Sequence, residues 1–358
     1  MSKLDSTRPA AVGYRWPAEW ETHKATWLSW PHNRDTWPKK FEPMVPQYVE
    51  MVRALATSEP VHILAGGESA RREAEEQLAS IDIVAARNIT FHDIPTNDAW
   101  IRDHGPVFLQ ATGDAEAGLI DWLYNSWGGK YPPYDLDNAV PRKLADLLSM
   151  KRFNPGFVLE GGAIEGNGNG TIMSTKSSLL DRRRNPTMDE SIVARYLQNY
   201  LGMQQLIWLP GTELAGDDTD GHIDQLARFV NQNTIVYASC HDSSDENYAS
   251  LYANQQALSE AVDPNGNSWQ IIPLPIPAPM YYEGSRLPAS YCNFYIANSI
   301  VLVPAFDDPH DEIARTTLQQ CFPDRDVVLA NARDIVWGLG AFHCLTQQQC
   351  MPHQTPHN

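Results

Sequence analysis

The amino-acid sequence predicts an α/β fold, because apolar runs typical of strands alternate with segments of helical spacing along the chain. No linker or shift in composition divides the 358 residues, so we expect one domain that spans residues 1–358. The 26 prolines and 22 glycines indicate that many turns connect these elements.

The individual elements follow from the spacing of the apolar residues. The helix expected at 187–201 opens with TMDE, in which Thr187 and Glu190 have the spacing of a capping box. The stretch 165–175 predicts a tight turn between two strands; no helical pattern follows its glycines, which argues against a phosphate-binding loop. Strands are expected at 61–66, 204–211, 233–240, 299–306 and 326–332, and helices at 46–57, 68–79, 140–150, 187–201, 246–261 and 309–321.

The composition limits the classes of partner and compartment. The chain holds 27 Lys and Arg against 44 Asp and Glu, a net charge of −17, which disfavours binding to nucleic acid. No apolar run is long enough to cross a bilayer, and the first residues lack the apolar segment of a secretion signal. The run DRRR at 181–184 is expected to be a solvated loop. The five cysteines form no CxxC pair, which favours free thiols and a cytoplasmic protein.

Polar residues in apolar or glycine-rich surroundings mark the candidate site. They occur in NDAWIRDHGP (97–106), VLEGGAIEG (158–166), DDTDGHIDQLARF (217–229) and GLGAFHCLTQQ (338–348). Asp103 and Glu160 are 57 residues apart, Glu160 and His222 62, and His222 and Cys344 122, or twice 61. An interval of about 60 residues suggests stacked or radially arranged units, each contributing one loop to a common axis. A fifth unit, near residue 283, contributes no obvious catalytic group.

These residue types suit one kind of chemistry. A thiolate of Cys344 would attack an electrophilic carbon, and His222 would serve as general acid and base. The carboxylates of Asp103, Glu160 and Asp224 would raise the pKa of the thiol unless a cationic substrate neutralised them. A guanidinium group is such a cation, and it pairs with carboxylates in a bidentate manner. Attack on its central carbon followed by loss of ammonia is deimination.

The motifs NDAWIRDHGP, EGG, DTDGHID and FHCLTQQ, together with RWPAEWETHKATWLSWP (15–31), resemble those of the agmatine deiminases. The resemblance covers about residues 14–348, with a short tail at 352–358 that we expect to be flexible. It implies a single catalytic domain folded as a five-unit pseudo-symmetric α/β-propeller (a pentein), with the active site on its central axis. It also implies hydrolysis of agmatine to N-carbamoylputrescine and ammonia in polyamine (putrescine) biosynthesis.

The resemblance further implies the role of each residue in the reaction. Cys344 would form a covalent amidino-cysteine intermediate, and His222 would protonate the departing ammonia and then activate water. Glu160 would handle protons together with His222. Asp103 and Asp224 would hold the guanidinium group.

The remaining expectations concern substrate, cofactors and partners. The resemblance implies that Trp100 lines the alkyl part of the substrate and that Asp218 receives its free amine. It implies a small cationic guanidine as substrate, neither cofactor nor metal, and assembly as a homo-oligomer. The chain has Leu339 and Ala341 where the family usually has glycine and asparagine. This difference leaves arginine or peptidyl-arginine open as alternative substrates.

Two other functions remain open at the level of the sequence. The H-x-D pair of His222 and Asp224, expected on one face of an extended segment, is also half of a metal site, as in an arginase-like ureohydrolase. A guanidine-binding protein without turnover is the second alternative.

His343 is expected to point away from the site on a strand, where it would only pack or cap. The other cysteines are expected to be inert thiols of the core.

Overall fold

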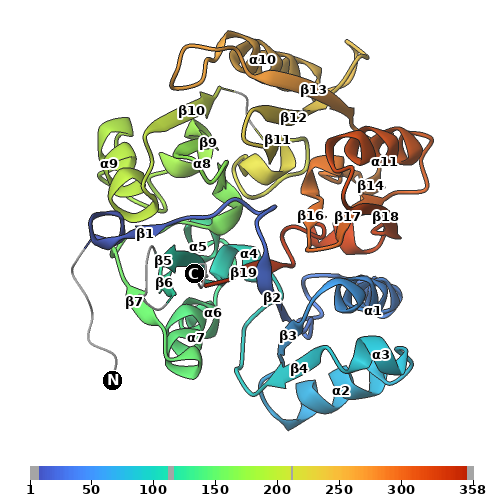
Figure 1. Cartoon of the computed structure of the whole chain (residues 1–358). Helices are drawn as coiled ribbons and strands as arrows, with labels where there is room; N and C mark the ends of the chain where they lie inside the picture. The colour runs from blue at the N-terminus through green and yellow to red at the C-terminus, as the bar shows by residue number, and fades with distance from the viewer. Residues whose placement is uncertain (1–7, 112–116, 211–212, 353–358) are drawn as a thin grey trace.

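The computed structural model describes residues 8–111, 117–210 and 213–352, apart from the side chains of residues 83 and 84. Within these residues, each of five sheets combines an antiparallel strand pair with a parallel pair. The α/β fold is therefore confirmed. Figure 1 shows the sheets spread around the middle of the molecule, with the longer helices at its periphery.

The five sheets follow one another along the chain. One has the order β1 (Tyr14–Arg15), β5 (Val107–Ala111), β6 (Gly118–Ile120), β7 (Lys151–Phe153). The next three are β10 (Gln205–Leu209), β9 (Thr171–Thr175), β8 (Ile164–Gly166); β11 (Ala227–Asn231), β12 (Thr234–Ser239), β13 (Gln270–Pro275); and β16 (Tyr295–Ile296), β17 (Ile300–Ala305), β18 (Asp326–Asn331). The fifth pairs the two ends of the chain: β19 (Gln347–Cys350), β2 (His23–Ser29), β3 (Val61–Leu64), β4 (Ile89–His92). A hairpin of β14 (Tyr281–Tyr282) and β15 (Ser285–Arg286) stands apart.

Helices connect the parallel strands of each sheet, as parallel pairing requires. The longer ones are α1 (Phe41–Ser58), α2 (Glu68–Leu78), α7 (Val140–Leu148), α9 (Glu190–Leu201), α10 (Tyr248–Glu260) and α11 (His310–Cys321). All six helices and all five strands expected from the sequence are present. Four-residue helices fill the loops: α3 (Ile83–Ala86), α4 (Ile101–His104), α5 (Ser126–Gly129), α6 (Asp135–Asn138) and α8 (Lys176–Leu179). The 3₁₀ turns are η1 (Pro9–Val12), η2 (Gly161–Ala163), η3 (Ile223–Gln225), η4 (Tyr291–Asn293) and η5 (Ile335–Gly338).

Helix α1 illustrates how the sequence produces these layers. Its apolar residues recur at helical spacing and are buried, including Met44, Tyr48, Val52 and Leu55. It therefore packs one face against the largest core cluster, which extends through β17 and β18 to the turn that carries Cys344. The site thus lies against a rigid core.

Two local expectations need correction or lie outside the description. The capping box at Thr187 is wrong: helix α9 begins at Glu190, and Asp189 caps it by accepting a hydrogen bond of 2.9 Å from the amide of Ile192. Asp189 is in extended backbone and two residues closer to the helix than Thr187, so its short carboxylate satisfies the free amide. The expected turn at 165–175 is confirmed between β8 and β9. Residues 353–358 of the tail lie outside the described residues.

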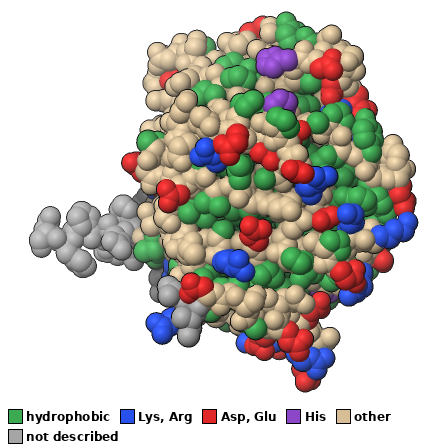
Figure 2. Space-filling view, turned by 90° about the vertical axis from the view of Figure 1, so that its right-hand side faces the viewer, with side chains coloured by type: hydrophobic (Ala, Val, Ile, Leu, Met, Phe, Trp, Pro, Cys, Tyr) green, Lys and Arg blue, Asp and Glu red, His purple; other side chains and the backbone are tan. Residues whose placement is uncertain are grey.

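The surface carries charges of both signs. On the face in Figure 2, Asp and Glu are interspersed with Lys and Arg, and the basic side chains form no continuous area. Among the helices of the described residues, none is both long and apolar enough to cross a membrane.

Candidate active site

Five residues predicted to carry the chemistry meet at one place, although they come from four distant segments. Asp103 lies in α4, Glu160 directly before η2, His222 directly before η3, Asp224 within η3, and Cys344 in the turn after η5. All five are buried. The turns and short helices leave backbone amides free near the side chains, which regular strands would not do.

Gly162, the second glycine of EGG, allows the side chains of Asp103 and His222 to lie close together. The amide of Gly162 donates to Asp103 Oδ1 at 3.0 Å. A Cβ atom at position 162 would lie 2.7 Å from His222 Nδ1 and 2.8 Å from Asp103 Oδ1. Any larger residue would therefore push the two functional side chains apart.

His222 lies between two carboxylates. Its Nδ1 is 3.6 Å from Asp103 Oδ1, and its Nε2 is 3.8 Å from Glu160 Oε2. These distances are too long for hydrogen bonds, so both ring nitrogens are buried without a hydrogen-bond partner in the structure. Burial lowers the pKa of His222, but Asp103, Glu160 and Asp224 outweigh burial and raise that pKa to about 9. Because no hydrogen bond holds the ring nitrogens, the imidazolium of His222 is able to donate a proton to a substrate atom.

The sequence expectation for the H-x-D pair is partly wrong. His222 and Asp224 lie close to the same cluster, but they are not on an extended strand. His222 is the residue before η3, and Asp224 lies inside that 3₁₀ turn. The glycine before His222, at φ +87°, turns the chain into this conformation.

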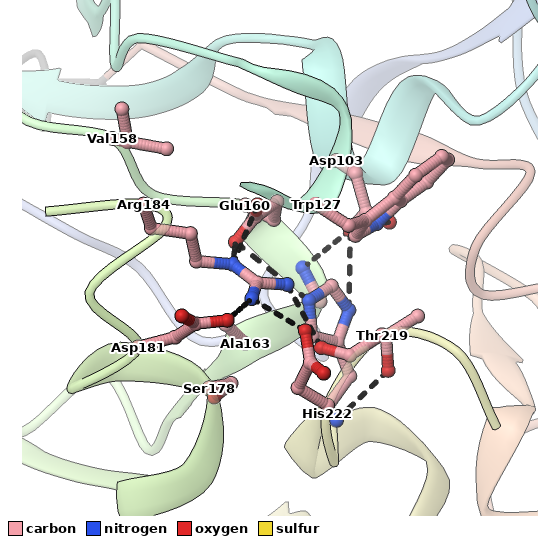
Figure 3. Close-up of polar contacts among 12 residues, drawn as sticks. Asp103, Trp127, Val158, Glu160, Ala163, Ser178, Asp181, Arg184, Thr219 and His222 are labelled. Atoms are coloured by element: carbon pink, nitrogen blue, oxygen red, sulfur yellow. Dashed lines mark hydrogen bonds and ion pairs between the residues drawn. The ribbon is translucent and has the colours of Figure 1, made fainter. Parts of the chain in front are cut away.

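Glu160 is fixed by a residue that the sequence analysis placed in solvent. Arg184 Nε donates to both carboxylate oxygens of Glu160 at 2.9 Å, and Arg184 Nη1 donates to Asp181 (Figure 3). Arg184 Nη1 also donates to Asp220 at 2.7 Å. The expectation that DRRR is a solvated loop is thus wrong for Arg184, which is buried. Burial raises the pKa of Glu160, but Arg184 and His222 more than offset burial and bring that pKa to about 2. Glu160 is therefore a carboxylate at neutral pH.

Asp103 is held from the opposite side. Trp127 Nε1 donates to its Oδ2 at 3.0 Å, a contact visible in Figure 3. Burial raises the pKa of Asp103 to about 6. His222 lowers this pKa, but the carboxylates of Asp224 and Glu160 oppose that effect. Trp127 was not among the predicted site residues, because the stretch NSWGG gives no sign that its indole has a polar role.

Cys344 faces this acidic cluster. Its Sγ lies 3.5 Å from Asp224 Oδ2 and 3.2 Å from Asn293 Nδ2. Burial raises the pKa of the thiol well above its ordinary value, and Asp224 and Asp103 raise that pKa further. A bound cation would reverse this last effect. Asn293 was not predicted either. It comes from the region of the fifth unit, which was expected to contribute no obvious catalytic group.

His343 differs from its prediction. It lies in a turn, not on a strand, and its side chain points toward the site. Its Nδ1 is 2.7 Å from Asp224 Oδ2 and its Nε2 is 2.8 Å from Glu19 Oε2. Glu19 also pairs with Arg228 at 3.1 Å. His343 thus connects Asp224 to a buried ion cluster beneath the site, formed by Glu19, Arg102, Glu165, Arg228 and His343.

A cavity of about 620 Å³ opens onto Cys344 and Asp103. Trp100 and Asp218 line it, which leaves their implied contacts with the substrate as predictions, and Asp218 Oδ2 accepts a hydrogen bond of 2.6 Å from the Tyr131 hydroxyl. The charged lining residues are acidic apart from Arg286, and the others include several aromatic side chains: Asp35, Asp98, Asp103, Asp217, Asp218, Glu283, Trp100, Trp127, Tyr131, Tyr282 and Trp337. Such a cavity suits a cation with an apolar stem.

The two departures from the family pattern lie beside this cavity. Leu339 has φ +69°, a left-handed conformation that favours glycine, and it lines the cavity. Ala341 donates its amide to Asn293 Oδ1 at 3.1 Å.

The described residues contain no group of three or more His, Cys, Asp or Glu side chains arranged to hold a metal ion. His222 and Asp224 thus lack the further ligands that an arginase-like site would need. The five cysteines are all free, as expected; Cys292, Cys344 and Cys350 are buried, whereas Cys240 and Cys321 are partly exposed.

Comparison with known proteins identifies the family. A model of the Porphyromonas-type peptidyl-arginine deiminases matches residues 15–350. The agmatine deiminase of Pseudomonas aeruginosa (strain LESB58) is 36% identical over 381 residues, which cover 99% of this chain and 100% of that relative. The agmatine deiminase of Ectopseudomonas mendocina (strain ymp) is also 36% identical, over 97% of this chain and 98% of the relative.

Solved structures agree with these sequences. The agmatine deiminase of Enterococcus faecalis matches with a TM-score of 0.89 and 28% identity, over 98% of this chain and 99% of that one. An agmatine deiminase of C. jejuni with substrate bound matches with a TM-score of 0.86 and 32% identity, over 95% and 97%. The chain therefore belongs to the Porphyromonas-type peptidyl-arginine deiminase family, and its full-length similarity to agmatine deiminases confirms the resemblance predicted from its motifs.

Proposed function

We propose that the protein hydrolyses agmatine to N-carbamoylputrescine and ammonia through a covalent amidino-cysteine intermediate. One observation carries the proposal: the Cys344 thiol and the Asp103 carboxylate line the same acidic cavity, and Asp103 and Glu160 flank the imidazole of His222. We propose agmatine as the substrate because the chain aligns with agmatine deiminases over nearly their full length.

In the first half of the reaction, the guanidinium group of the substrate pairs with Asp103 and Asp224. Its positive charge offsets their effect on the thiol, so the thiolate of Cys344 forms more readily. The sulfur attacks the guanidinium carbon, a C–S bond forms, and the C=N electron pair moves onto nitrogen. His222, protonated at neutral pH with a pKa of about 9, gives its proton to a terminal nitrogen; the C=N bond re-forms as the bond from carbon to that terminal nitrogen breaks, and the nitrogen leaves as ammonia.

In the second half, His222 is neutral and accepts a proton from water as the water oxygen attacks the amidino carbon. The C–S bond then breaks, its electron pair returns to the Cys344 sulfur, and the product carries a urea group. Glu160, ionised with a pKa of about 2, favours the imidazolium form in both halves. Arg184 keeps the carboxylate of Glu160 aligned with the ring.

The substitution Cys344→Ser tests the proposal. The serine hydroxyl is rarely ionised at neutral pH, so ammonia release from agmatine should fall to background while the unfolding transition stays unchanged. Iodoacetamide should modify Cys344 in the native protein, and saturating agmatine should slow that modification. Normal turnover by the serine variant would show that the covalent mechanism is wrong.

A substrate panel separates the alternatives. We expect ammonia from agmatine and little from arginine, because the acidic lining disfavours the carboxylate of arginine; arcaine and an arginyl peptide complete the panel. Preference for the arginyl peptide would support peptidyl-arginine deimination, which the family name suggests. Binding of agmatine without turnover would support a guanidine-binding protein. Activity should also survive exhaustive chelation; loss that manganese reverses would support the arginase-like alternative.

We further infer a five-unit pseudo-symmetric α/β-propeller that forms one catalytic domain over residues 1–358, with the site on its axis. The shared strand pattern of the five sheets supports this inference, as does the origin of Asp103, Glu160, His222, Asn293 and Cys344 in different sheets' loops. A role in putrescine biosynthesis follows from the proposed product. The free thiols support a cytoplasmic location, and size-exclusion chromatography would test the expected homo-oligomer.

A further inference from the structure

We propose that Asn293 is a further catalytic residue, whose side-chain amide stabilises the Cys344 sulfur both as attacking thiolate and as leaving group. The proposal rests on the proposed function in taking Cys344 as the nucleophile. Neither the motifs nor the carboxylate cluster includes Asn293. It is the last residue of η4 and is 1% exposed.

The orientation of this amide is fixed by the chain around the nucleophile. Asn293 Oδ1 accepts hydrogen bonds from the backbone amides of Ala341 at 3.1 Å and Cys344 at 3.3 Å. An amide oxygen accepts and an amide nitrogen donates, so these two bonds set which end is which. The nitrogen Nδ2 must then face the sulfur, at 3.2 Å. The backbone amide of His343 also donates to the carbonyl oxygen of Asn293, at 3.1 Å.

The charges around the sulfur explain why such a donor is needed. Asp224 Oδ2 is 3.5 Å from Sγ, and the site is buried, so both repulsion and desolvation oppose a thiolate. In the described part of the chain, Asn293 supplies the side-chain N–H group within hydrogen-bonding distance of Sγ. A lysine or arginine there would repel the guanidinium substrate, whereas a neutral amide stabilises the thiolate without opposing the charge of the substrate.

The sulfur is an anion twice in the reaction. It loses its charge when the C–S bond forms, and regains it when water has attacked and the C–S electron pair returns to sulfur. A donor fixed at Sγ therefore favours ionisation at the start and departure at the end. Since a hydrogen bond to a charged acceptor is stronger than one between neutral groups, its removal affects the anion more than the thiol.

Alkylation of Cys344 by iodoacetamide as a function of pH tests this role without any substrate. The probe reacts with the thiolate, so the midpoint of the rate profile reports the apparent pKa of the thiol. For Asn293→Ala we expect the midpoint to rise by about one pH unit, with alkylation about tenfold slower below it. For Asn293→Asp we expect a larger rise, because a carboxylate replaces the donor.

Two controls keep the test decisive. Asn293→Asp retains an oxygen for the two backbone amides, so it preserves the turn if the alanine variant unfolds. Ser290→Ala removes the hydroxyl that caps η4 and contacts Gln225, but it leaves the sulfur its donor, so the midpoint should stay at the wild-type pH. Wild-type midpoints in both Asn293 variants, or an equal rise in Ser290→Ala, would overturn the proposal. Failure of the wild-type protein to deiminate agmatine would instead leave this result intact and count against the proposed function alone.

Discussion

His222 and His343 are both fully buried, and both lie within the same cluster of carboxylates, but they are held in different ways. The ring nitrogens of His222 have carboxylate oxygens at 3.6 and 3.8 Å and no hydrogen-bond partner. The ring nitrogens of His343 have carboxylate oxygens at 2.7 and 2.8 Å. The first ring is free to exchange a proton with a substrate, whereas the second is committed to positioning Asp224.

The same difference holds for the regions around the two rings. Beneath the site, the ion cluster that contains His343 balances Glu19 and Glu165 with Arg102 and Arg228. In the described part of the chain, Asp103 has no basic partner closer than His222, and Asp218 is bonded to a neutral hydroxyl. The protein therefore balances the carboxylates beneath the site with arginines, whereas it leaves those of Asp103 and Asp218 in the cavity available to a cation.

Replacing each histidine by glutamine gives the largest expected effects. His222→Gln should lower kcat by roughly 10²–10⁴, because general acid and base catalysis is lost, and should also lower stability at neutral pH, because the imidazolium no longer offsets the charges of Asp103 and Glu160. His343→Gln should lower the free energy of unfolding by about 1–3 kcal/mol, because buried hydrogen bonds are lost. Its kcat should fall less, since Asp224 is only displaced. Steady-state kinetics and urea unfolding of both variants measure the difference between the two histidines. Equal losses of kcat in both variants would show that the two rings do not differ in role.

Breaking the ion cluster should cost the most stability. Arg228 is fully buried and pairs with Glu19 at 3.1 Å and Glu165 at 3.0 Å, so Arg228→Met removes the ion-pair partner of Glu165 and leaves Glu19 with only Arg102 and His343. We expect a loss of about 3–5 kcal/mol in urea unfolding. Arg183→Met is the matched control: Arg183 is half exposed and pairs with Asp181 and Asp220, which predicts a loss of about 0–1 kcal/mol.

Asp103→Asn should behave in the opposite way. It removes a buried charge that Asp224 and Glu160 disfavour, so stability should stay the same or rise while agmatine binding weakens. If Arg228→Met proved as stable as the wild type, or Asp103→Asn much less stable, the distinction between the two regions would be wrong.

The pH dependence of activity should report the uncompensated region. Asp103, with a pKa of about 6, must be ionised to bind the guanidinium, and His222, with a pKa of about 9, must be protonated to release ammonia. We therefore expect kcat/KM to rise through about pH 6 and fall through about pH 9, by up to tenfold per pH unit. The pKa of His222 is raised on folding, so its contribution to stability is present below the unfolded pKa and is lost as pH rises through 9. A His222→Gln variant that kept the alkaline limb would contradict this assignment.

The sequence predicted the elements and the chemical groups better than their local geometry. Strands such as β17 and helices such as α1 follow from apolar spacing, which depends only on neighbours along the chain. The carboxylates, His222 and Cys344 could be chosen because polar residues in apolar or glycine-rich context are unusual. The backbone around them could not be predicted: η3 and the turn at His343 depend on contacts with distant segments.

Arg184 and Asn293 were missed or misplaced because the partner of each is distant in the sequence. Arg184 looks like part of a charged loop, and its partner Glu160 is 24 residues away. Asn293 stands between Cys292 and Phe294, in the kind of apolar context that identified the other groups, so the same criterion could have found it. Its partner Cys344 is 51 residues away, and spacing alone does not show that the two meet.

The smallest expected effect concerns the far end of the substrate. Asp218 lines the cavity and is partly exposed, with its Oδ2 bonded to the Tyr131 hydroxyl at 2.6 Å. Lys130 contacts the backbone oxygen of Asp218 and the carboxylate of Asp220, at 2.9 Å, so the Asp218 carboxylate is available to the ammonium of agmatine.

Removal of this charge by Asp218→Asn should lower kcat/KM for agmatine roughly five- to thirtyfold, or about 1–2 kcal/mol, between the values for exposed and desolvated ion pairs. A simple alkylguanidine, which has no ammonium, should be turned over equally by both proteins. Tyr131→Phe is the control, because it removes the hydroxyl but keeps the charge and should change agmatine turnover less. If Asp218→Asn lost the same small factor for both substrates, a different group would read the amine, and the uncompensated charge at the mouth of the cavity would not be used for the substrate.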